Sequence, residues 1–176
     1  MASGGLKQGT TVALQSCEQY DIETDTWRVL PSMQTARASH AAVVKNGAVY
    51  VFGGFANGIH LDTIERLSGE KWDVVSTQTK FSARTAPGAI FIDDKRVVIF
   101  GGWDGKNYLS DVYVFDTTIM AIAMVNENTG VGICPEYYPT YCDKSKIVFG
   151  NYVNHTLYSM ELLSYSVKLF SKPTFQ

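Results

Sequence analysis

The chain of 176 residues carries 15 basic and 17 acidic side chains, a net charge of −2, with no block of either sign. This balance excludes the electrostatic case for a nucleic-acid or membrane-surface partner. No apolar run approaches the ~20 residues of a membrane-spanning helix, and the first residues lack the apolar segment of a secretory signal. The three cysteines have no metal-type spacing, so we expect free thiols in a reducing, cytoplasmic setting; a disulfide between Cys134 and Cys142 is the less favoured alternative.

Short apolar runs separated by polar turns follow one another along the whole chain. Only residues 118–125 compete as a helix, and their β-branched side chains favour a strand. Asn46-Gly47 is a hairpin turn signal between two such runs. The predicted strands are, in chain order, 16–21, 27–30, 39–44, 49–52, 63–67, 72–75, 89–92, 97–100, 111–116, 120–125, 138–143, 147–150, 157–163 and 167–170.

An apolar strand that ends in two glycines recurs at a fixed spacing. Residues 49–54 end in Gly53-Gly54, residues 97–102 end in Gly101-Gly102, and residues 147–151 are a degraded third copy. The first glycines are 48 and 49 residues apart, and Trp27 and Trp72 keep a similar spacing of 45. Four short strands per unit of about 50 residues predict the blades of a β-propeller. A β-sandwich is the alternative, but it does not require the glycine pair at the same place in every unit.

At this point the sequence resembles the Kelch-repeat family, whose pattern is an apolar strand ending in Gly-Gly, then a tyrosine-bearing strand and a tryptophan. Residues 18–27, which hold Tyr20 and Trp27, follow Gly4-Gly5 in this way. An arginine before the first strand of a blade is matched by Arg37 and, one period later, by Arg84. The resemblance implies an all-β Kelch-type propeller segment of four-stranded antiparallel blades, with Gly53, Gly54, Gly101, Gly102, Trp27 and Trp72 in structural roles.

The later units depart from the family pattern. Met120 stands where a tryptophan is expected, Asn151 stands for the second glycine, and Cys134 or Pro135 occupies the place of the arginine. In this division residues 1–32 are a half blade of strands c and d, and 33–78, 79–127 and 128–172 are blades, the last one weaker.

About three and a half blades cannot close a ring. The favoured explanation is a piece of a longer propeller; completion of the ring by another chain is the second, and an open arc or a sandwich-like rearrangement the third. A homodimer does not close simply, because both copies carry a surplus c–d pair; six blades from two chains stay a minor hypothesis.

The sequence offers no recognisable catalytic motif. The histidines and cysteines form no nucleophile–base pattern, and no metal, P-loop or dinucleotide signature is present. A copper oxidase site, which some Kelch-like propellers carry, has no support in the spacing of these residues. We therefore expect no cofactor, no metal and no enzymatic activity.

The resemblance places recognition on one set of loops: those after strand b and those that enter strand a. Exposed aromatic and arginine side chains there are typical of interface anchors, and arginine can grip a carboxylate with two hydrogen bonds, so an acidic motif is a plausible ligand. The alternative for the two arginines is that they bond backbone carbonyls inside the blade. The candidate partner-binding residues are Arg37, Phe55, Asn57, His60, Arg84, Trp103, Asp104, Asn107, Tyr108, Tyr152 and Asn154.

These expectations converge on a protein–protein interaction module that binds a protein or peptide through its inter-strand loops. A propeller domain of an oxidase-like or other enzyme is the competing class, and a purely architectural subunit of a larger assembly is the third.

Overall fold

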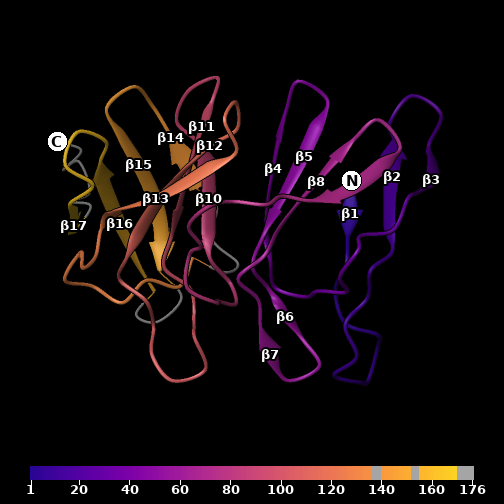
Figure 1. Cartoon of the computed structure of the whole chain (residues 1–176), viewed down its shortest axis with the longest axis horizontal. Helices are drawn as coiled ribbons and strands as arrows, with labels where there is room; N and C mark the ends of the chain where they lie inside the picture. Colours follow the sequence, from indigo (N-terminus) through magenta and orange to yellow (C-terminus); the bar gives the residue numbers. More distant parts are fainter. Residues whose placement is uncertain (136–139, 152–154, 170–176) are drawn as a thin grey trace, which may run out of the picture.

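The computed structural model describes residues 1–135, 140–151 and 155–169, and in these ranges the protein is built from strands and turns without a helix. Four antiparallel sheets stand side by side in chain order (Figure 1). The all-β prediction is therefore confirmed, and the row of sheets does not close into a ring. No helix in the described ranges could cross a membrane.

Each sheet is a meander in which consecutive strands pair. The first sheet has three strands, because β1 (Ala2–Ser3) adds to the two that the sequence places in residues 1–32; a further hairpin, β6–β7, stands apart from the sheets. The other strands of the first sheet are β2 (Cys17–Asp21) and β3 (Thr26–Leu30). The second sheet holds β4 (Ala41–Lys45), β5 (Ala48–Phe52), β8 (Ile64–Ser68) and β9 (Lys71–Val74), and the separate hairpin holds β6 (Phe55–Ala56) and β7 (Ile59–His60). The third sheet holds β10 (Gly88–Phe91), β11 (Arg96–Phe100), β12 (Val112–Asp116) and β13 (Ala121–Asn126), and the fourth holds β14 (Thr140–Cys142), β15 (Lys146–Asn151), β16 (Thr156–Glu161) and β17 (Val167–Leu169).

The sheets pack face to face through strands that are apolar on both sides. In β5, Val49 and Val51 belong to the core shared with the first sheet, whereas Tyr50 and Phe52 belong to the core shared with the third. Successive side chains of a strand point to opposite faces, so a strand between two sheets must be apolar throughout. This is why the runs at 49–52 and 97–100 read as continuous hydrophobic segments.

The glycine pairs end the second strand of a blade with a backbone that only glycine adopts easily. Gly53 and Gly54 have φ angles of 63° and 106°, and Gly101 and Gly102 have 60° and 100°. A Cβ atom on Gly101 would lie 2.3 Å from a backbone oxygen of the next linker. Both the left-handed backbone and the close approach of the next blade therefore require glycine here.

The two tryptophans occupy the same register but not the same surroundings. Trp27 pairs with Tyr20 and Trp72 with Leu67, in each case one pair inside the end of the hairpin. Trp72 is 1% exposed because it packs on the first sheet, whereas Trp27 is 59% exposed. Trp27 thus lies at the position predicted for a structural tryptophan, but it is not buried, because no described sheet covers it.

The third and fourth sheets correct three details of the repeat alignment. Ile147 and Phe149 face the third sheet as Val97 and Ile99 face the second, which puts Asn151 at the position of the first glycine, not the second. Ile133, rather than Cys134 or Pro135, stands at the arginine position, because the Gly102 amide donates to its carbonyl as the Gly54 amide donates to that of Arg84. Ile122, rather than Met120, takes the place of the tryptophan, since it pairs with Phe115 as Trp72 pairs with Leu67.

Candidate partner-binding face

The loops after the glycine pairs and the linkers between sheets gather at one end of the molecule. In Figure 1 they lie along the lower edge. The β2–β3 turn of the first sheet lies at the opposite edge, as do the turns between the first and second and between the third and fourth strands of the other sheets. The loop face is defined here as the loops 55–61 and 103–109 together with the linkers 35–39 and 82–86. Seven of the candidate residues lie on the two loops, namely Phe55, Asn57, His60, Trp103, Asp104, Asn107 and Tyr108, and the candidates Arg37 and Arg84 lie in the linkers. Tyr152 and Asn154 lie outside the described residues.

The first loop is a small hairpin with an aromatic base. β6 and β7 pair Phe55 with His60, and the two rings lie edge to face with centroids 5.3 Å apart. Asn57 and Gly58 turn the chain with φ angles of 51° and 84°, a backbone that Asn and Gly tolerate well. The turn leaves Ile59 exposed at the tip, a residue that sequence analysis did not select although it follows an Asn-Gly turn signal.

The second loop repeats this design with larger rings. Trp103 and Tyr108 form a bridge pair with ring centroids 4.7 Å apart, and Tyr108 is 41% exposed. Between them the Asp104 carboxylate accepts hydrogen bonds from the amides of Asn107 at 2.6 Å and Lys106 at 2.7 Å. These bonds, the one from Asn107 above all, lower the pKa of Asp104. Asp104 thus shapes the loop, and its charge is held by the backbone.

Thr85 and Gly105 connect the two loops into one surface. The backbone of Thr85 exchanges two hydrogen bonds with Trp103, and its hydroxyl lies 2.7 Å from Nδ1 of His60. A Cβ atom on Gly105 would come within 2.9 Å of His60 Nε2, so the second loop passes directly over the imidazole. Thr85 was not a candidate from sequence, because nothing local distinguishes it from other linker threonines.

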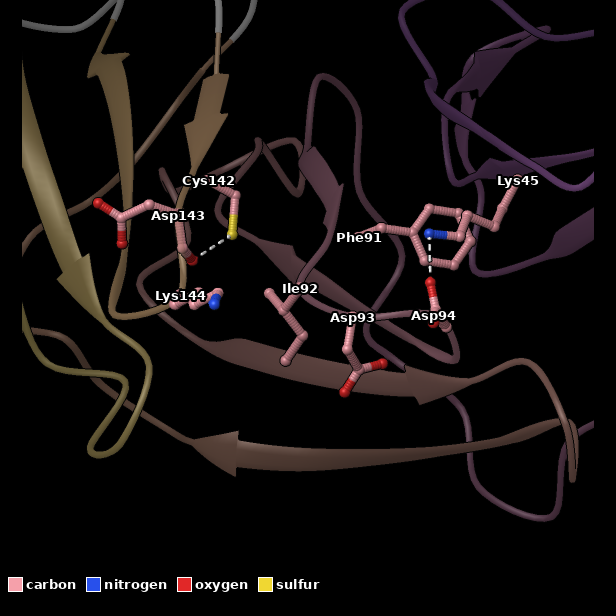
Figure 2. A pocket seen from close by; sticks show the side chains of 8 residues that line it. All are labelled: Lys45, Phe91, Ile92, Asp93, Asp94, Cys142, Asp143 and Lys144. Atoms are coloured by element: carbon pink, nitrogen blue, oxygen red, sulfur yellow. Dashed lines mark hydrogen bonds and ion pairs between the residues drawn. The ribbon is translucent and has the colours of Figure 1, made fainter.

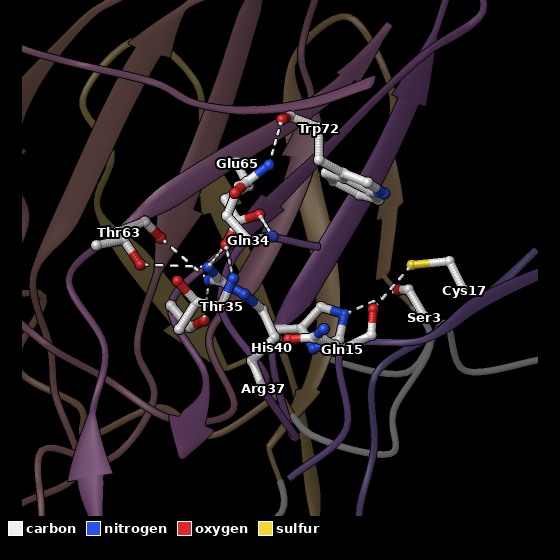
Figure 3. A network of polar contacts seen from close by, with 11 residues as sticks. Ser3, Gln15, Cys17, Gln34, Thr35, Arg37, His40, Thr63, Glu65 and Trp72 are labelled. Carbon is white, nitrogen blue, oxygen red and sulfur yellow. Dashed lines mark hydrogen bonds and ion pairs between the residues drawn. The ribbon is translucent and has the colours of Figure 1, made fainter. Parts of the chain in front are cut away.

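Arg37 is not a surface residue, and its expected place in the partner-binding set is corrected by its burial (Figure 3). Its side chain is 0% exposed; Nη1 donates to the carbonyl of Gly53 at 2.7 Å and Nη2 to the carboxylate of Glu65 at 2.5 Å. Glu65 also accepts from the amides of Gln34 and Thr35. The network therefore joins the linker to strands β5 and β8, which is the structural alternative left open by the sequence.

Arg84 has the same structural role in the next blade. It is also 0% exposed, donates from Nη1 to the carbonyl of Gly101 at 2.8 Å, and pairs with both oxygens of Asp111 at 2.8 and 2.9 Å. Its guanidinium lies 5.1 Å from the ring centroid of Tyr113. Both arginines thus lie beneath the loop face and support it from inside.

Where Ile133 replaces the arginine, the fourth sheet fixes its linker from the other side. The buried Asn151 amide accepts from the amide of Cys134 and donates to the carbonyl of Gly132, both at 3.0 Å. A side chain on the strand thus bonds the linker backbone, whereas in the other blades a side chain on the linker bonds the strand backbone. In the sequence, this exchange appears only as two separate departures from the family pattern, one in the linker and one at the end of the strand.

The surroundings of the titratable groups behind the loop face suit packing rather than catalysis. Burial, and then the charge of Arg37, lower the pKa of His40 to about 4, although its Nε2 lies 3.0 Å from the hydroxyl of Ser3. An imidazole of this pKa is a weak general base at neutral pH. Burial raises the pKa of the Cys17 and Cys142 thiols, which disfavours the reactive thiolate. In the described part of the chain no cysteine forms a disulfide and no group of His, Cys, Asp or Glu could hold a metal ion.

A shallow recess of about 290 Å³ lies at the opposite end of the molecule, where β4, β10 and β14 end (Figure 2). Its charges are largely paired within the protein: Lys45 lies 2.8 Å from Asp94, with its ammonium 5.7 Å from the ring centroid of Phe91. Asp93 is bonded to Arg96. An open recess most of whose charged groups already have partners offers less for a ligand than the loop face does.

Comparison with known proteins agrees with this architecture. The family model of the KLHDC2/KLHL20/DRC7 Kelch-repeats domain matches residues 1–172. The chain is similar to tip elongation aberrant protein 3 of Schizosaccharomyces pombe, with 33% identity over 91 residues, or 47% of this chain and 8% of that protein. It is also similar to human Kelch-like protein 23, with 37% identity over 62 residues, or 33% of this chain and 11% of that protein.

The chain thus spans only about a tenth of the length of these curated relatives. The family match, by contrast, covers nearly all of the chain and agrees with the four antiparallel sheets and the repeated glycine pairs. The chain therefore belongs to the Kelch-repeat family.

Proposed function

We propose that this protein is a protein–protein interaction module that binds a partner protein or peptide through its loop face. The observation that carries the proposal is the continuous surface formed by the hairpin 55–60 and the loop 103–108, joined by Thr85. Rigid β scaffolds commonly display recognition residues on their connections. Here the scaffold is stiffened from within by the buried networks of Arg37 and Arg84.

The chemistry of this surface favours a partner that offers apolar and hydrogen-bonding groups. Ile59 and Tyr108 are its exposed apolar anchors, and Asn57 and Asn107 are exposed amides beside them. Tyrosine combines apolar area with a polar tip, which suits a protein interface. An acidic motif is no longer favoured as the ligand, because the two arginines that would bind its carboxylate are buried and hydrogen-bonded within the protein.

We further propose that the module performs no chemistry of its own and works in a reducing, cytoplasmic setting. The raised pKa of the Cys17 and Cys142 thiols and the lowered pKa of His40 support the first point. The three cysteines outside any disulfide support the second. Metal analysis of purified protein tests the oxidase-like alternative, which a stoichiometric metal would favour.

A peptide library displayed on phage, selected against the wild-type protein, tests the binding proposal. The selected peptides should lose most of their affinity for Tyr108→Ala and Ile59→Ser, since truncation of an anchor typically costs about 1–2 kcal/mol or more. Val44→Ser is the matched control, because Val44 is equally exposed but lies on β4, outside the loops. Peptides that bind Val44→Ser poorly and the loop variants well would place the binding surface elsewhere.

A further inference from the structure

An indole fills the outer part of the interface between the first and second sheets. Trp72 of β9 lies in one core cluster with Cys17 and Leu30 of the first sheet, and its Nε1 donates to the carbonyl of Pro31 at 2.9 Å. The face that it covers is made of alternate residues of β2 and β3. The second sheet turns the equivalent face of β8 and β9 toward the third sheet, so the same space has to be filled there.

At this next interface a smaller side chain stands in the place of the indole. Ile122 pairs with Phe115 as Trp72 pairs with Leu67, but it is smaller than tryptophan and has no side-chain N–H. An open recess of about 270 Å³ lies between the outer strands of the two sheets, away from the loop face. Its lining residues are Arg66, Asp73, Val74, Val75, Ser76 and Met120.

The third and fourth sheets leave a comparable recess. Val167 stands at the tryptophan position of the fourth sheet, since it pairs with Met160 of β16, and this interface has no indole either. A recess of about 310 Å³ lies between β12 and β13 on one side and the turn residue Tyr165 on the other. Its cation, Arg96, is already bonded to Asp93. A recess thus accompanies the missing tryptophan at both interfaces, but only the first of them has a cation to spare in the part of the chain that the structure describes.

That cation is Arg66. Its guanidinium lies 5.8 Å from the ring centroid of Tyr50, its Nη2 makes one long bond of 3.4 Å to the hydroxyl of Ser68, and its Nε has no hydrogen-bond partner. Asp73 is its cross-strand neighbour, but that carboxylate lies 2.5 Å from Nζ of Lys71. Among the described residues Arg66 forms no ion pair. Since a guanidinium takes a carboxylate with two parallel hydrogen bonds, this wall of the recess suits an anionic group.

We propose that the recess between the second and third sheets binds a small aromatic carboxylate, with its ring in the place of the missing indole and its carboxylate on Arg66. The volume suits one fused ring, since pockets for drug-sized ligands run from roughly 300 to 1,000 Å³. Val75 and Met120 supply apolar contacts for the ring. Ser76 stands at the position of Pro31, so its carbonyl suits a ring N–H donor.

A titration with indole-3-propionate, followed in amide NMR spectra, tests the proposal. The largest shifts should fall on the amides around Val75 and Met120. 3-Methylindole, which lacks the carboxylate, should bind there about tenfold more weakly, the effect of one hydrogen bond to a charged group. Arg66→Met should weaken binding of the acid by a similar factor and leave the affinity for 3-methylindole unchanged.

Two further variants locate the site. Arg28→Met is the matched control and should change neither affinity, because Arg28 lies on the equivalent face of the first sheet, where Trp72 fills the space. Ile122→Trp puts an indole back and should remove the shifts caused by both compounds; its amide spectrum establishes whether it folds, and Arg66→Met decides the question if it does not. A wild type that shows no shifts at the recess, an Arg66→Met variant that binds the acid as tightly as the wild type, or a folded Ile122→Trp variant that binds normally overturns the proposal.

Discussion

Arg84 offers the sharpest test of the claim that the arginines hold the blades together. Replacing it with Met keeps most of the side-chain volume but removes the bonds to the Gly101 carbonyl and to both oxygens of Asp111. Asp111 is only 14% exposed at its side chain, so its charge is left poorly solvated. Breaking a buried ion pair from one side costs about 3–5 kcal/mol; since Asp111 keeps some contact with water, we expect about 3 kcal/mol of lost unfolding free energy.

Urea unfolding monitored by circular dichroism, at one fixed protein concentration, measures this loss. Asp111→Asn removes the carboxylate charge that the Arg84→Met change leaves unpaired. The double variant Arg84→Met/Asp111→Asn should therefore be more stable, by about 1–2 kcal/mol, than the sum of the two single losses predicts. Arg28→Met on the exposed strand β3 is the matched control and should cost no more than about 0.5 kcal/mol. If Arg84→Met costs less than about 1 kcal/mol, Arg84 does not support the blade as described.

Three further outcomes follow from the same contacts. Because the pKa of His40 falls from 6.5 to about 4 on folding, the unfolded chain binds more protons between these values, and stability should drop by at most about 3 kcal/mol as the pH is lowered through this window; His40→Gln should flatten that part of a stability–pH profile. Gly102→Ala should cost about 2–3 kcal/mol in urea unfolding, since φ is 100° and the new Cβ would lie 2.6 Å from a backbone oxygen, whereas Gly130→Ala, in open space at φ 79°, should cost only about 1 kcal/mol. Asn151→Ala should cost about 1–3 kcal/mol, because two backbone groups of the linker lose their partner, and thermal melts of this variant showing no loss would contradict its role in place of the arginine.

The strands and their order follow from local chemistry, and for that reason they could be predicted. Continuous apolar runs such as 49–52, which lies between the Asn46-Gly47 turn and the Gly53-Gly54 pair, define a strand buried on both faces. Their repeat at a spacing of about 50 residues then predicts stacked sheets, because similar local sequences build similar units. The candidate loops 55–61 and 103–109 followed from the resemblance to the Kelch-repeat family, carried over by position.

What the sequence by itself determined, then, is the strand pattern, the glycine-pair turns and the blade as a unit. Only the tertiary structure decided which of two like residues is buried: Trp27 and Trp72 share a register, but only Trp72 has a sheet packed against it. It also decided that Arg84 supports the loops from inside, and that Asn151 and Ile133 replace an arginine together. The physical reason is that burial and hydrogen-bond partners belong to pairs of segments far apart in the chain, which local periodicity does not specify.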